Sequence, residues 1–235
     1  MKIEVLYSEL CNLNGDLGNI RYLEQCLPGA EFIYTSILET PAFTDTDVNM
    51  VYMGPMSEDS QELVLKKLKP YTKRIKQLID NNVLFLITGN ALDLFGNYIK
   101  DEEKKIECLK IFDFYVERNM FGRHNSLCLG EFDKLEMVGF KSQFTWTYGD
   151  NSNNYFIKVI RGYGINKNSK YEGIHVNNFF GTNLLGPILI MNPYFTKYLM
   201  NLLGVKKPKL KFETETIDAY DQRLKEFKDL NKKID

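Results

Sequence analysis

Short apolar runs and amphipathic segments alternate along the first half of the chain. The apolar runs predict strands at Lys2–Tyr7, Glu31–Ser36, Met50–Met53 and Val83–Thr88. The last run has no charged residue, which is typical of a strand buried on both faces of a parallel sheet. The intervening segments predict a helix at Gly18–Leu27 and another that Ser57 caps and Pro70 breaks. This order of elements predicts an α/β fold.

The second half of the chain has a different pattern. From Ile106 onward the predicted strands lie closer together, so we expect antiparallel strands to be added to a mostly parallel sheet flanked by helices. Asn192–Leu203 is predicted to be a helix with Asn192 as its cap and Pro193 in its first turn. The composition becomes highly charged after residue 205. We therefore predict one domain over residues 1–205 and a charged helical tail over residues 206–235, with an exposed helix at Thr214–Lys233.

Composition excludes several classes of protein. The 235 residues include 30 Lys+Arg and 31 Asp+Glu, and a net charge of −1 argues against a nucleic-acid clamp. Apolar residues make up 44% and charged residues 26%, which is typical of a soluble globular protein. Asn and Pro residues interrupt the apolar stretch Gly173–Thr196, so we expect no membrane span. The four cysteines have neither C-x-x-C nor zinc spacing, which predicts buried thiols in a reducing cytoplasm and no metal site.

Candidate chemistry lies in two turns that follow predicted strands, where ligand sites of doubly wound sheets form. The turn from Thr88 to Gly96, with a short helical run at Ala91–Phe95, has the layout of a nucleophile elbow. Its central residue is Gly89, which tolerates the positive φ of an elbow but carries no attacking side chain. The second turn, Gly54-Pro55-Met56, could offer N–H groups to an oxyanion, although Pro55 has none. Ordinary strand-to-helix connections remain an equal alternative for both turns.

Five segments carry a resemblance to a known family. They are Leu6–Ile20 (LYSELCNLNGDLGNI), Gly54–Gln61 (GPMSEDSQ), Thr88–Gly96 (TGNALDLFG), Val138–Gln143 (VGFKSQ) and Gly162–Pro193. In this order they resemble the class I glutamine amidotransferases of the cobyric-acid-synthase-like (CobB/CobQ-like) type, and most closely the glutaminase (GatD) subunits of lipid II isoglutaminyl synthase. The resemblance covers about residues 1–205. It implies a flavodoxin-like fold, no cofactor, and ammonia delivery to a Mur-ligase-like, ATP-dependent synthetase.

In that family an elbow cysteine attacks the amide of glutamine and a histidine transfers the proton. The elbow motif Cys-Gly-Gly-Tyr-Gln-x-x-Gly places Gly89 at the cysteine position, and Gly-Thr-Tyr-Leu-His-Gly-Pro places Leu185 at the histidine position. We therefore predict no catalytic residues and no glutaminase activity. His124, in a polar loop, is interpreted as a solvated surface residue, and His175, on a predicted strand, as a structural one.

Binding residues can remain where catalytic ones are missing. The candidates for the substrate site are Gly54, Pro55, Asn90 and Arg123, the last as a partner for a carboxylate. The loop of the opening motif contains Asn14, Gly15, Asp16, Gly18 and Asn19. These residue types favour tight turns and helix caps, so a structural role and a binding or docking role are both open.

The leading hypothesis is a non-hydrolytic partner or regulator of the synthetase, in a heterodimer, in cell-wall precursor amidation. One alternative is an active glutaminase with a displaced nucleophile, which would supply ammonia for lipid II or corrinoid amidation. The other is a small-molecule binding module. We expect neither a metal nor a nucleic acid as partner, and glutamine is a candidate ligand.

Overall fold

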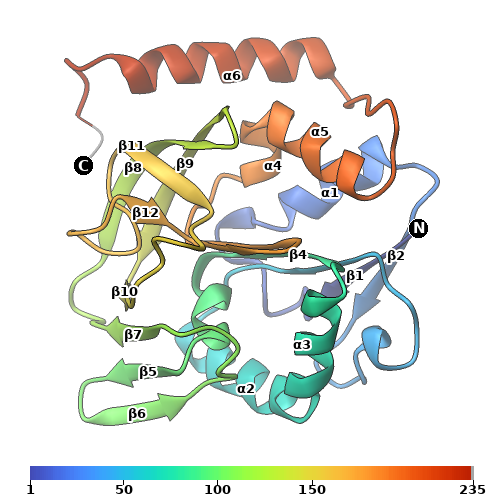
Figure 1. The fold of residues 1–235 in the computed structure, drawn as a ribbon, viewed down its shortest axis with the longest axis vertical. Coiled ribbons are helices and arrows are strands. Elements are labelled where there is room, and N and C mark those ends of the chain that lie inside the picture. The colour runs from blue at the N-terminus through green and yellow to red at the C-terminus, as the bar shows by residue number, and fades with distance from the viewer. Residues whose placement is uncertain (234–235) are drawn as a thin grey trace.

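A six-stranded sheet, sheet A, lies at the centre of the computed structural model, which describes residues 1–233 (Figure 1). In spatial order its strands are β13 (Ile174–Val176), β14 (Phe179–Thr182), β4 (Leu84–Thr88), β3 (Met50–Met53), β1 (Lys2–Leu6) and β2 (Glu31–Thr35). All neighbouring strands are parallel except β13, which runs antiparallel to β14. The parallel strands follow the flavodoxin-like order, with the topological switch between β1 and β3.

Helices cover both faces of sheet A. On one face lie α1 (Gly18–Cys26), α4 (Ile188–Met191) and α5 (Pro193–Leu202), and on the other lie α2 (Glu58–Leu68) and α3 (Thr72–Asp80). Successive side chains of a strand point to opposite faces. In β4, Leu84 and Leu86 therefore pack with α1, α4 and α5, while Phe85 and Ile87 pack with α2 and α3. Burial on both sides explains why this strand carries no charge.

The predicted signals at the ends of α2 are confirmed. The Ser57 hydroxyl accepts a hydrogen bond from the Ser60 N–H at 3.3 Å and so caps the helix. The helix ends at Leu68, and a 3₁₀ turn over Lys69–Tyr71 contains Pro70 before α3 begins. The proline thus divides one amphipathic segment into two helices.

Asn192 is the N-cap residue of α5, as predicted, but its side chain makes no capping bond. Instead its Oδ1 accepts from the Val138 N–H at 2.8 Å, and its Nδ2 donates to the Val138 carbonyl, also at 2.8 Å. An amide can pair with both backbone groups of a strand residue, and this pairing joins the start of α5 to β9 (Leu135–Gln143). Pro193 is in the first turn of α5, as predicted.

Two four-stranded sheets add the expected antiparallel strands. Sheet B consists of β10 (Thr145–Tyr148), β7 (Tyr115–Arg118), β5 (Tyr98–Asp101) and β6 (Lys104–Glu107). Sheet C consists of β12 (Tyr171–Glu172), β11 (Ile157–Arg161), β8 (His124–Phe132) and β9 (Leu135–Gln143). Only β5 and β7 pair in parallel. Short 3₁₀ helices also occur at Leu13–Gly15, Ala42–Thr44 and Gly89–Phe95.

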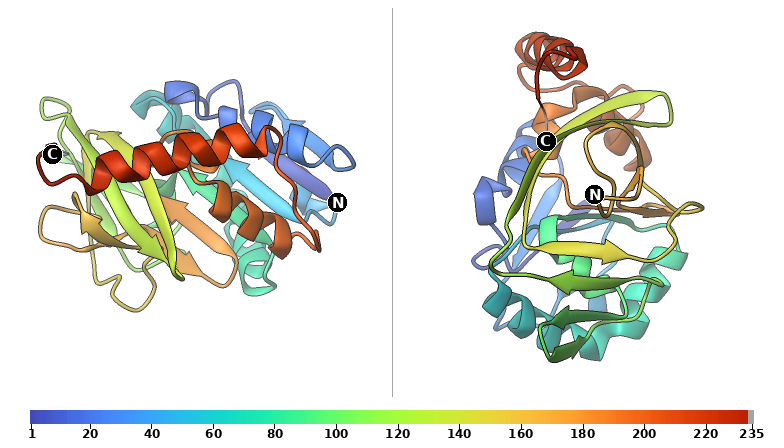
Figure 2. Two further views of the ribbon diagram at one scale, coloured as in Figure 1. Left: turned by 90° about the horizontal axis from the view of Figure 1, so that it is seen from above. Right: turned by 90° about the vertical axis from the view of Figure 1, so that its left-hand side faces the viewer.

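The last helix, α6 (Glu213–Lys228), lies across β8, β9, α4 and α5 (Figure 2). Its Tyr220 and Phe227 rings are buried against this surface. Arg161 of β11 donates to the carbonyl of Phe227 at 2.5 Å and to that of Asp229 at 2.8 Å, which holds the end of the helix. The predicted helix is present, but it ends at Lys228 instead of Lys233, and one side of it is packed against the preceding fold instead of exposed. The division of the chain at residue 205 stays a prediction.

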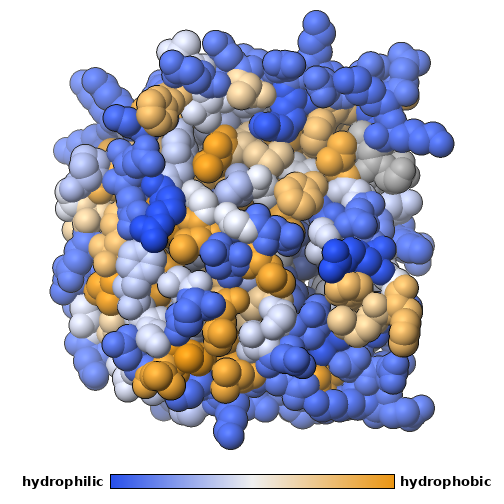
Figure 3. Space-filling model, turned by 180° about the vertical axis from the view of Figure 1, so that it is seen from behind, coloured by the Kyte–Doolittle hydropathy of each residue, from blue (hydrophilic) through white to orange (hydrophobic). Residues whose placement is uncertain are grey.

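Large apolar side chains that are exposed are spread over several elements and loops, although Met120 adjoins Phe121, and Tyr194 and Leu202 are both on α5. Leu38 and Phe121 are among the most exposed of them. Figure 3 shows apolar side chains interspersed with charged ones on the face opposite to that of Figure 1. Single exposed apolar residues need no functional explanation. Among residues 1–233, no helix has the length and apolar character needed to cross a membrane.

Candidate functional site

A cavity of about 150 Å³ lies at the carboxyl ends of β3 and β4. Of the residues predicted for the site, Asn14, Pro55, Gly89, Asn90, Arg123 and Leu185 line it. Gly15, Asp16, Gly18, Asn19 and Gly54 do not belong to its lining. A larger hollow of about 480 Å³ lies beside His175 at the opposite end of β14, and its lining includes neither of the predicted turns. The smaller cavity is therefore the candidate site.

The elbow backbone is formed as predicted, but there is no room for a side chain at its central residue, Gly89. Gly89 has φ of +59°, in the left-handed region that glycine adopts freely. A Cβ atom at this position would lie 2.6 Å from Cβ of Pro55 and 3.2 Å from Cδ2 of Leu185. Leu185 is fixed there because its backbone pairs with Phe140 of β9 in both directions. Pro55 and Leu185 thus occupy the space in which a side chain at the elbow would have to stand.

In the turn after β3, one donor that an oxyanion would need is absent and another is engaged. Pro55 has no N–H, and the Met56 N–H donates to Oδ1 of Asn90 at 2.9 Å. The Asn90 amide in turn donates to the Met56 carbonyl at 2.7 Å. Asn90 therefore joins the two turns through its side chain and satisfies the N–H group that could have faced a reacting carbonyl.

The opening motif forms a buried anchor beneath the site. Oδ2 of Asp16 accepts from the Tyr52 hydroxyl at 2.7 Å and from the Thr88 hydroxyl, and burial raises the pKa of this carboxyl above its usual value. Nδ2 of Asn19 donates to the Asp16 carbonyl at 2.9 Å. These bonds tie the loop after β1 to β3 and β4, so Asp16 and Asn19 hold the structure of the loop.

Two glycines of the motifs permit close backbone approaches. A Cβ at Gly54 would lie 2.6 Å from the Cys11 carbonyl oxygen, and one at Gly18 would lie 2.6 Å from Cγ of Pro187. Gly15, with φ of +70°, and Asn14, with φ of 59°, form the left-handed bend of the same loop. Asn14 is the only residue of the predicted loop set that lines the cavity.

Neither histidine lines the cavity. His175 is on β13, where its ring stacks on Phe180 with centroids 4.4 Å apart, which confirms its position on a sheet. The interpretation of His124 as a solvated loop residue is wrong: it begins β8 and is half-buried against Trp146, with ring centroids 4.5 Å apart. The apolar residues of this strand begin at Leu127, so the polar run His124–Ser126 gives no signal that extends the strand back to His124.

The buried thiols and the Thr88 hydroxyl are poor nucleophiles. Burial raises the pKa of the Cys11, Cys108 and Cys128 thiols to about 12, so the thiolate is scarce at neutral pH. Thr88 is fully buried and its hydroxyl donates to Asp16. Within residues 1–233, no group of three or more His, Cys, Asp or Glu side chains is arranged to hold a metal ion.

A second buried carboxyl, Asp93, lies behind the elbow. Its Oδ2 accepts from Nε2 of Gln61 at 3.3 Å, and Gln61 accepts from Arg118 at 2.5 Å. Burial raises the pKa of Asp93 to about 7, although the hydrogen bond from Gln61 and the charge of Arg118 oppose this shift. No local sequence signal marks Asp93, because Gln61 and Arg118 lie on α2 and β7, far from it along the chain.

This titration predicts a pH dependence of stability. A folded pKa near 7, above the ordinary value of 3.8, means that the folded state binds more protons than the unfolded state between these pH values. The contribution of Asp93 to stability therefore falls as the pH rises through this range. Urea unfolding at pH 5 and at pH 8 measures this change. Between the two pH values, the free energy of unfolding of Asp93→Asn should fall by less than that of the wild type. Equal losses in both proteins would contradict the assignment.

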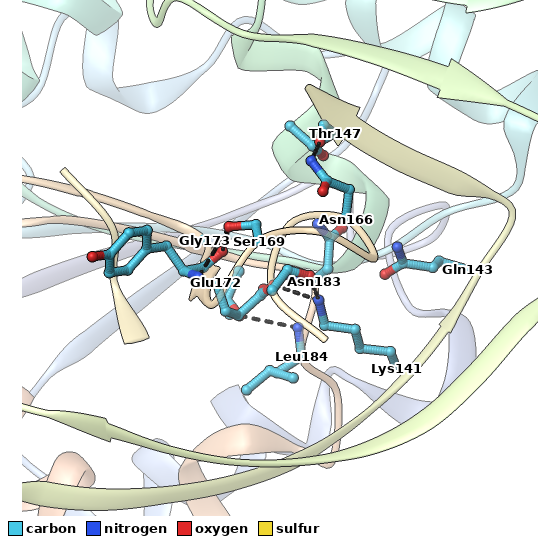
Figure 4. Close-up of polar contacts among 12 residues, drawn as sticks. Lys141, Gln143, Thr147, Asn166, Ser169, Glu172, Gly173, Asn183 and Leu184 are labelled. Atoms are coloured by element: carbon cyan, nitrogen blue, oxygen red, sulfur yellow. Dashed lines mark hydrogen bonds and ion pairs between the residues drawn. The ribbon is translucent and has the colours of Figure 1, made fainter. Parts of the chain in front are cut away.

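A buried ion pair supports the wall of the cavity that Asn183 and Leu185 form beside the elbow. Lys141 of β9 and Glu172 of β12 are both fully buried, and Nζ of Lys141 donates to Glu172 and, at 2.5 Å, to the Gly164 carbonyl (Figure 4). Oε1 of Glu172 accepts from the Thr182 hydroxyl at 3.0 Å and from the Asn183 N–H at 2.8 Å. The pair thus fixes the segment between β14 and Leu185.

The site has room for a small molecule, but the residues at the elbow cannot carry out a nucleophilic attack. Gly89 offers no nucleophile, Leu185 offers no base, and Asn90 engages the Met56 N–H. Arg123, Glu58 and several amide side chains remain on the lining. The arrangement therefore favours recognition over reaction.

Comparisons with known proteins identify the family. The GatD subunit of lipid II isoglutaminyl synthase (glutamine-hydrolyzing) from Staphylococcus aureus (strain N315) is 31% identical over 214 residues, which cover 90% of this chain and 87% of that protein. The subunit of the same name from Streptococcus pneumoniae (strain ATCC BAA-255 / R6) is 26% identical over 214 residues, covering 88% and 82%. No family model matches the chain.

Solved structures agree at the level of the fold. A crystal structure of a glutamine amidotransferase covers 86% of this chain and 99% of its own, with a TM-score of 0.58 and 12% identity. A glutamine amidotransferase from Thermotoga maritima covers 96% and 92%, with a TM-score of 0.53 and 11% identity. The expected glutamine amidotransferase fold is thus confirmed, while the CobB/CobQ type stays a prediction. The chain belongs to the GatD family of glutamine amidotransferase-like subunits.

Proposed function

We propose that this protein is a glutamine amidotransferase-like subunit that does not hydrolyse glutamine and that serves a Mur-ligase-like, ATP-dependent amidating synthetase as partner or regulator. The observation that carries the proposal is the closed elbow: Gly89 stands at the centre, and Pro55 and Leu185 fill the space around it. A histidine in place of Leu185 and a cysteine in place of Gly89 would both be needed for the family reaction.

The partner and the pathway are inferred from the relatives. Both are named as subunits of lipid II isoglutaminyl synthase, an enzyme that amidates a cell-wall precursor. By this likeness we place the chain in a heterodimer with the synthetase in the cytoplasm and in lipid II amidation. Coexpression with the synthetase encoded nearest to it should yield a complex on size-exclusion chromatography, and two separate peaks would contradict the partnership.

The absence of hydrolysis is tested by ammonia release from L-glutamine. Purified protein should release none above the rate of a buffer blank, alone or with the synthetase, because no group at the elbow can form the acyl intermediate. A glutamine-hydrolysing GatD from Staphylococcus aureus, purified in the same way, is the positive control. Steady release that survives removal of contaminating glutaminase would overturn the proposal.

An active glutaminase with a displaced nucleophile is the competing proposal. It would supply ammonia for amidation of lipid II or of a corrinoid carboxylate. The pKa of about 12 for three thiols and the hydrogen bond from Thr88 to Asp16 argue against it. Labelling with an electrophilic glutamine analogue, followed by mass spectrometry, separates the two: the displaced-nucleophile proposal requires one modified residue, and the non-hydrolytic proposal requires none.

A further inference from the structure

A run of lysines connects α5 to α6. Residues 206–212 (KKPKLKF) contain four lysines and no acidic residue, although the whole chain has a net charge of −1. All four lysines are exposed, and within residues 1–233 none of them forms an ion pair: Lys206, Lys207, Lys209 and Lys211. The run therefore presents a concentrated positive charge at the surface.

The backbone of this run is held against the fold. Leu210 is buried and packs in the same apolar cluster as α1 and α5. The Lys211 N–H donates to Sγ of Cys26 at 3.3 Å, and the Lys211 carbonyl accepts from the Tyr22 hydroxyl at 3.0 Å. Both partners belong to α1. A charged segment that is fixed in this way loses little conformational entropy when it binds a surface.

The acidic residues that adjoin the run do not cancel its charge. Glu213 of α6 pairs with Lys197 of α5 at 2.6 Å and accepts from the Leu210 N–H at 2.9 Å, so its carboxylate is already engaged. Residues 197–216 carry five lysines and two glutamates, of which Glu215 is the second. The surface around the connection thus keeps an excess of positive charge.

An exposed aromatic side chain ends the run. Phe212 is 60% exposed, and its φ of 51° and ψ of 46° lie in the left-handed region, which bulky residues seldom adopt. An asparagine would adopt these angles more readily and would expose no apolar ring, so the fold alone does not account for phenylalanine here. Nζ of Lys211 lies 5.3 Å from the ring centroid. Lysines beside an exposed aromatic ring are typical of segments that bind the interface of an anionic membrane.

The run lies at the end of sheet A opposite to the candidate site. Lys211 contacts Cys26, the last residue of α1, and α1 connects β1 to the parallel strand β2. The end of α1 therefore lies where β2 begins, whereas the cavity lies at the carboxyl ends of β3 and β4. In Figure 1 the run is the bend between α5 and α6, on the same side of the molecule as the N-terminus. A surface bound there leaves the cavity open.

We propose that residues 206–212 bind the surface of an anionic phospholipid membrane, with the lysines on the headgroups and the Phe212 ring at the boundary with the acyl chains. The choice of a membrane rests on the proposed function, because the lipid II in the relatives' name is a precursor that carries a lipid. Such binding is peripheral and needs no helix that crosses the membrane. It holds the subunit beside the substrate of its synthetase while the cavity stays accessible.

Flotation of the full chain with lipid vesicles tests the proposal. One set of vesicles is phosphatidylcholine, and in the other phosphatidylglycerol replaces about a third of it to supply negative charge. The chain should bind the anionic vesicles at least about tenfold more tightly, and about 0.5 M salt should remove most of this difference because it screens the charges. Equal binding to both sets, or binding to neither, would overturn the proposal.

Neutralising the run tests the lysines. A variant with all four replaced should bind anionic vesicles at least about tenfold more weakly and keep its melting temperature, because no ion pair with the described residues is lost: Lys206→Gln, Lys207→Gln, Lys209→Gln and Lys211→Gln. The matched control makes the same change of charge at four exposed lysines of the segment that contains α2 and α3: Lys66, Lys67, Lys69 and Lys73. The control should bind as the wild type does. Equal weakening of both variants would mean that only net charge matters and would overturn the assignment.

Phe212→Asn tests the aromatic ring. It should weaken binding to anionic vesicles about fivefold, as expected for a ring that is partly buried in the interface. It should not lower thermal stability, because asparagine tolerates the left-handed backbone. Phe121→Asn is the matched control, since that ring is 93% exposed in the loop between β7 and β8, outside the run, and its loss should not affect binding. Undiminished binding of a folded Phe212→Asn would contradict the placement of the ring in the membrane.

Failure of this proposal and failure of the proposed function give different results. Vesicle binding by the isolated chain involves neither glutamine nor the synthetase. Ammonia release, or the absence of a complex with the synthetase, contradicts the proposed function and leaves the vesicle result unchanged. If the wild type binds no vesicles and the lysine variant loses the complex, the run docks on an acidic surface of the synthetase, and the membrane proposal is wrong.

Discussion

Replacing Lys141 with methionine is expected to lower the free energy of unfolding by about 3–5 kcal/mol, because the change leaves the Glu172 carboxylate buried without its cation. Both side chains of the pair are inaccessible to solvent, so water cannot take over the lost interaction. Glu172 also accepts from Thr182 and Asn183, and an uncompensated charge there disturbs the segment that leads to Leu185. Urea unfolding followed by circular dichroism measures the loss.

A double-mutant cycle separates the pair from the packing around it. Adding Glu172→Gln to Lys141→Met removes the unpaired charge and should recover a large part of the stability, since a neutral amide retains the bonds from Thr182 and Asn183. The exposed pair Lys100–Glu117, with an N–O distance of 3.3 Å, is the control, and Lys100→Met should cost about 1 kcal/mol or less. Similar losses for Lys141→Met and Lys100→Met would contradict this interpretation.

Sequence patterns predicted the parts of the structure that depend on local chemistry. The uncharged run before Thr88 became a central strand because only a strand buried on both faces excludes charge over its full length. Gly89 was placed at a positive φ because an elbow requires it and glycine alone adopts it without strain. Ser57 and Pro70 marked helix boundaries through the bonds that they make or prevent.

Contacts between distant segments could not be predicted in this way. Lys141 and Glu172 lie 31 residues apart, and nothing in either local sequence indicates that the two charges meet inside the fold. Asn192 is the N-cap residue that its position before a proline predicted, but its side chain pairs with Val138, 54 residues earlier. The sequence also shows that Pro55 has no N–H. It does not show that Pro55 lies against Gly89, because that contact depends on the pairing of β3 with β4.

The same distinction applies to the candidate site. The motifs assigned Gly89 and Leu185 to one reaction, and the structure brings these residues together beside Pro55. Asn183 and Gln143 also line the cavity. Each has a buried polar atom without a hydrogen-bond partner in residues 1–233, which is a property of the folded chain that no local pattern indicates.

Restoring glutaminase activity is expected to require three substitutions rather than two. Gly89→Cys alone places a Cβ atom 2.6 Å from Pro55, and overpacking of this kind should lower the free energy of unfolding by about 1–3 kcal/mol without producing activity. Leu185→His supplies the base, and it also removes one of the two side chains that crowd the elbow. In the double variant Pro55 still crowds the thiol and still offers no N–H to the oxyanion.

Pro55→Gly addresses both defects, so the triple variant should release ammonia from glutamine about 10²–10³ times faster than Gly89→Cys with Leu185→His, the gain expected of one oxyanion donor. The comparison is made by coupled ammonia assay on proteins whose folding has been checked by circular dichroism. Pro41→Gly in the same double variant is the matched control, because Pro41 precedes a 3₁₀ helix and does not line the cavity. Equal rates for the double and triple variants would mean that Pro55 does not obstruct the elbow. A triple variant that folds but stays inactive would place the obstruction in the Asn90 bond to the Met56 N–H, which Asn90→Gly removes.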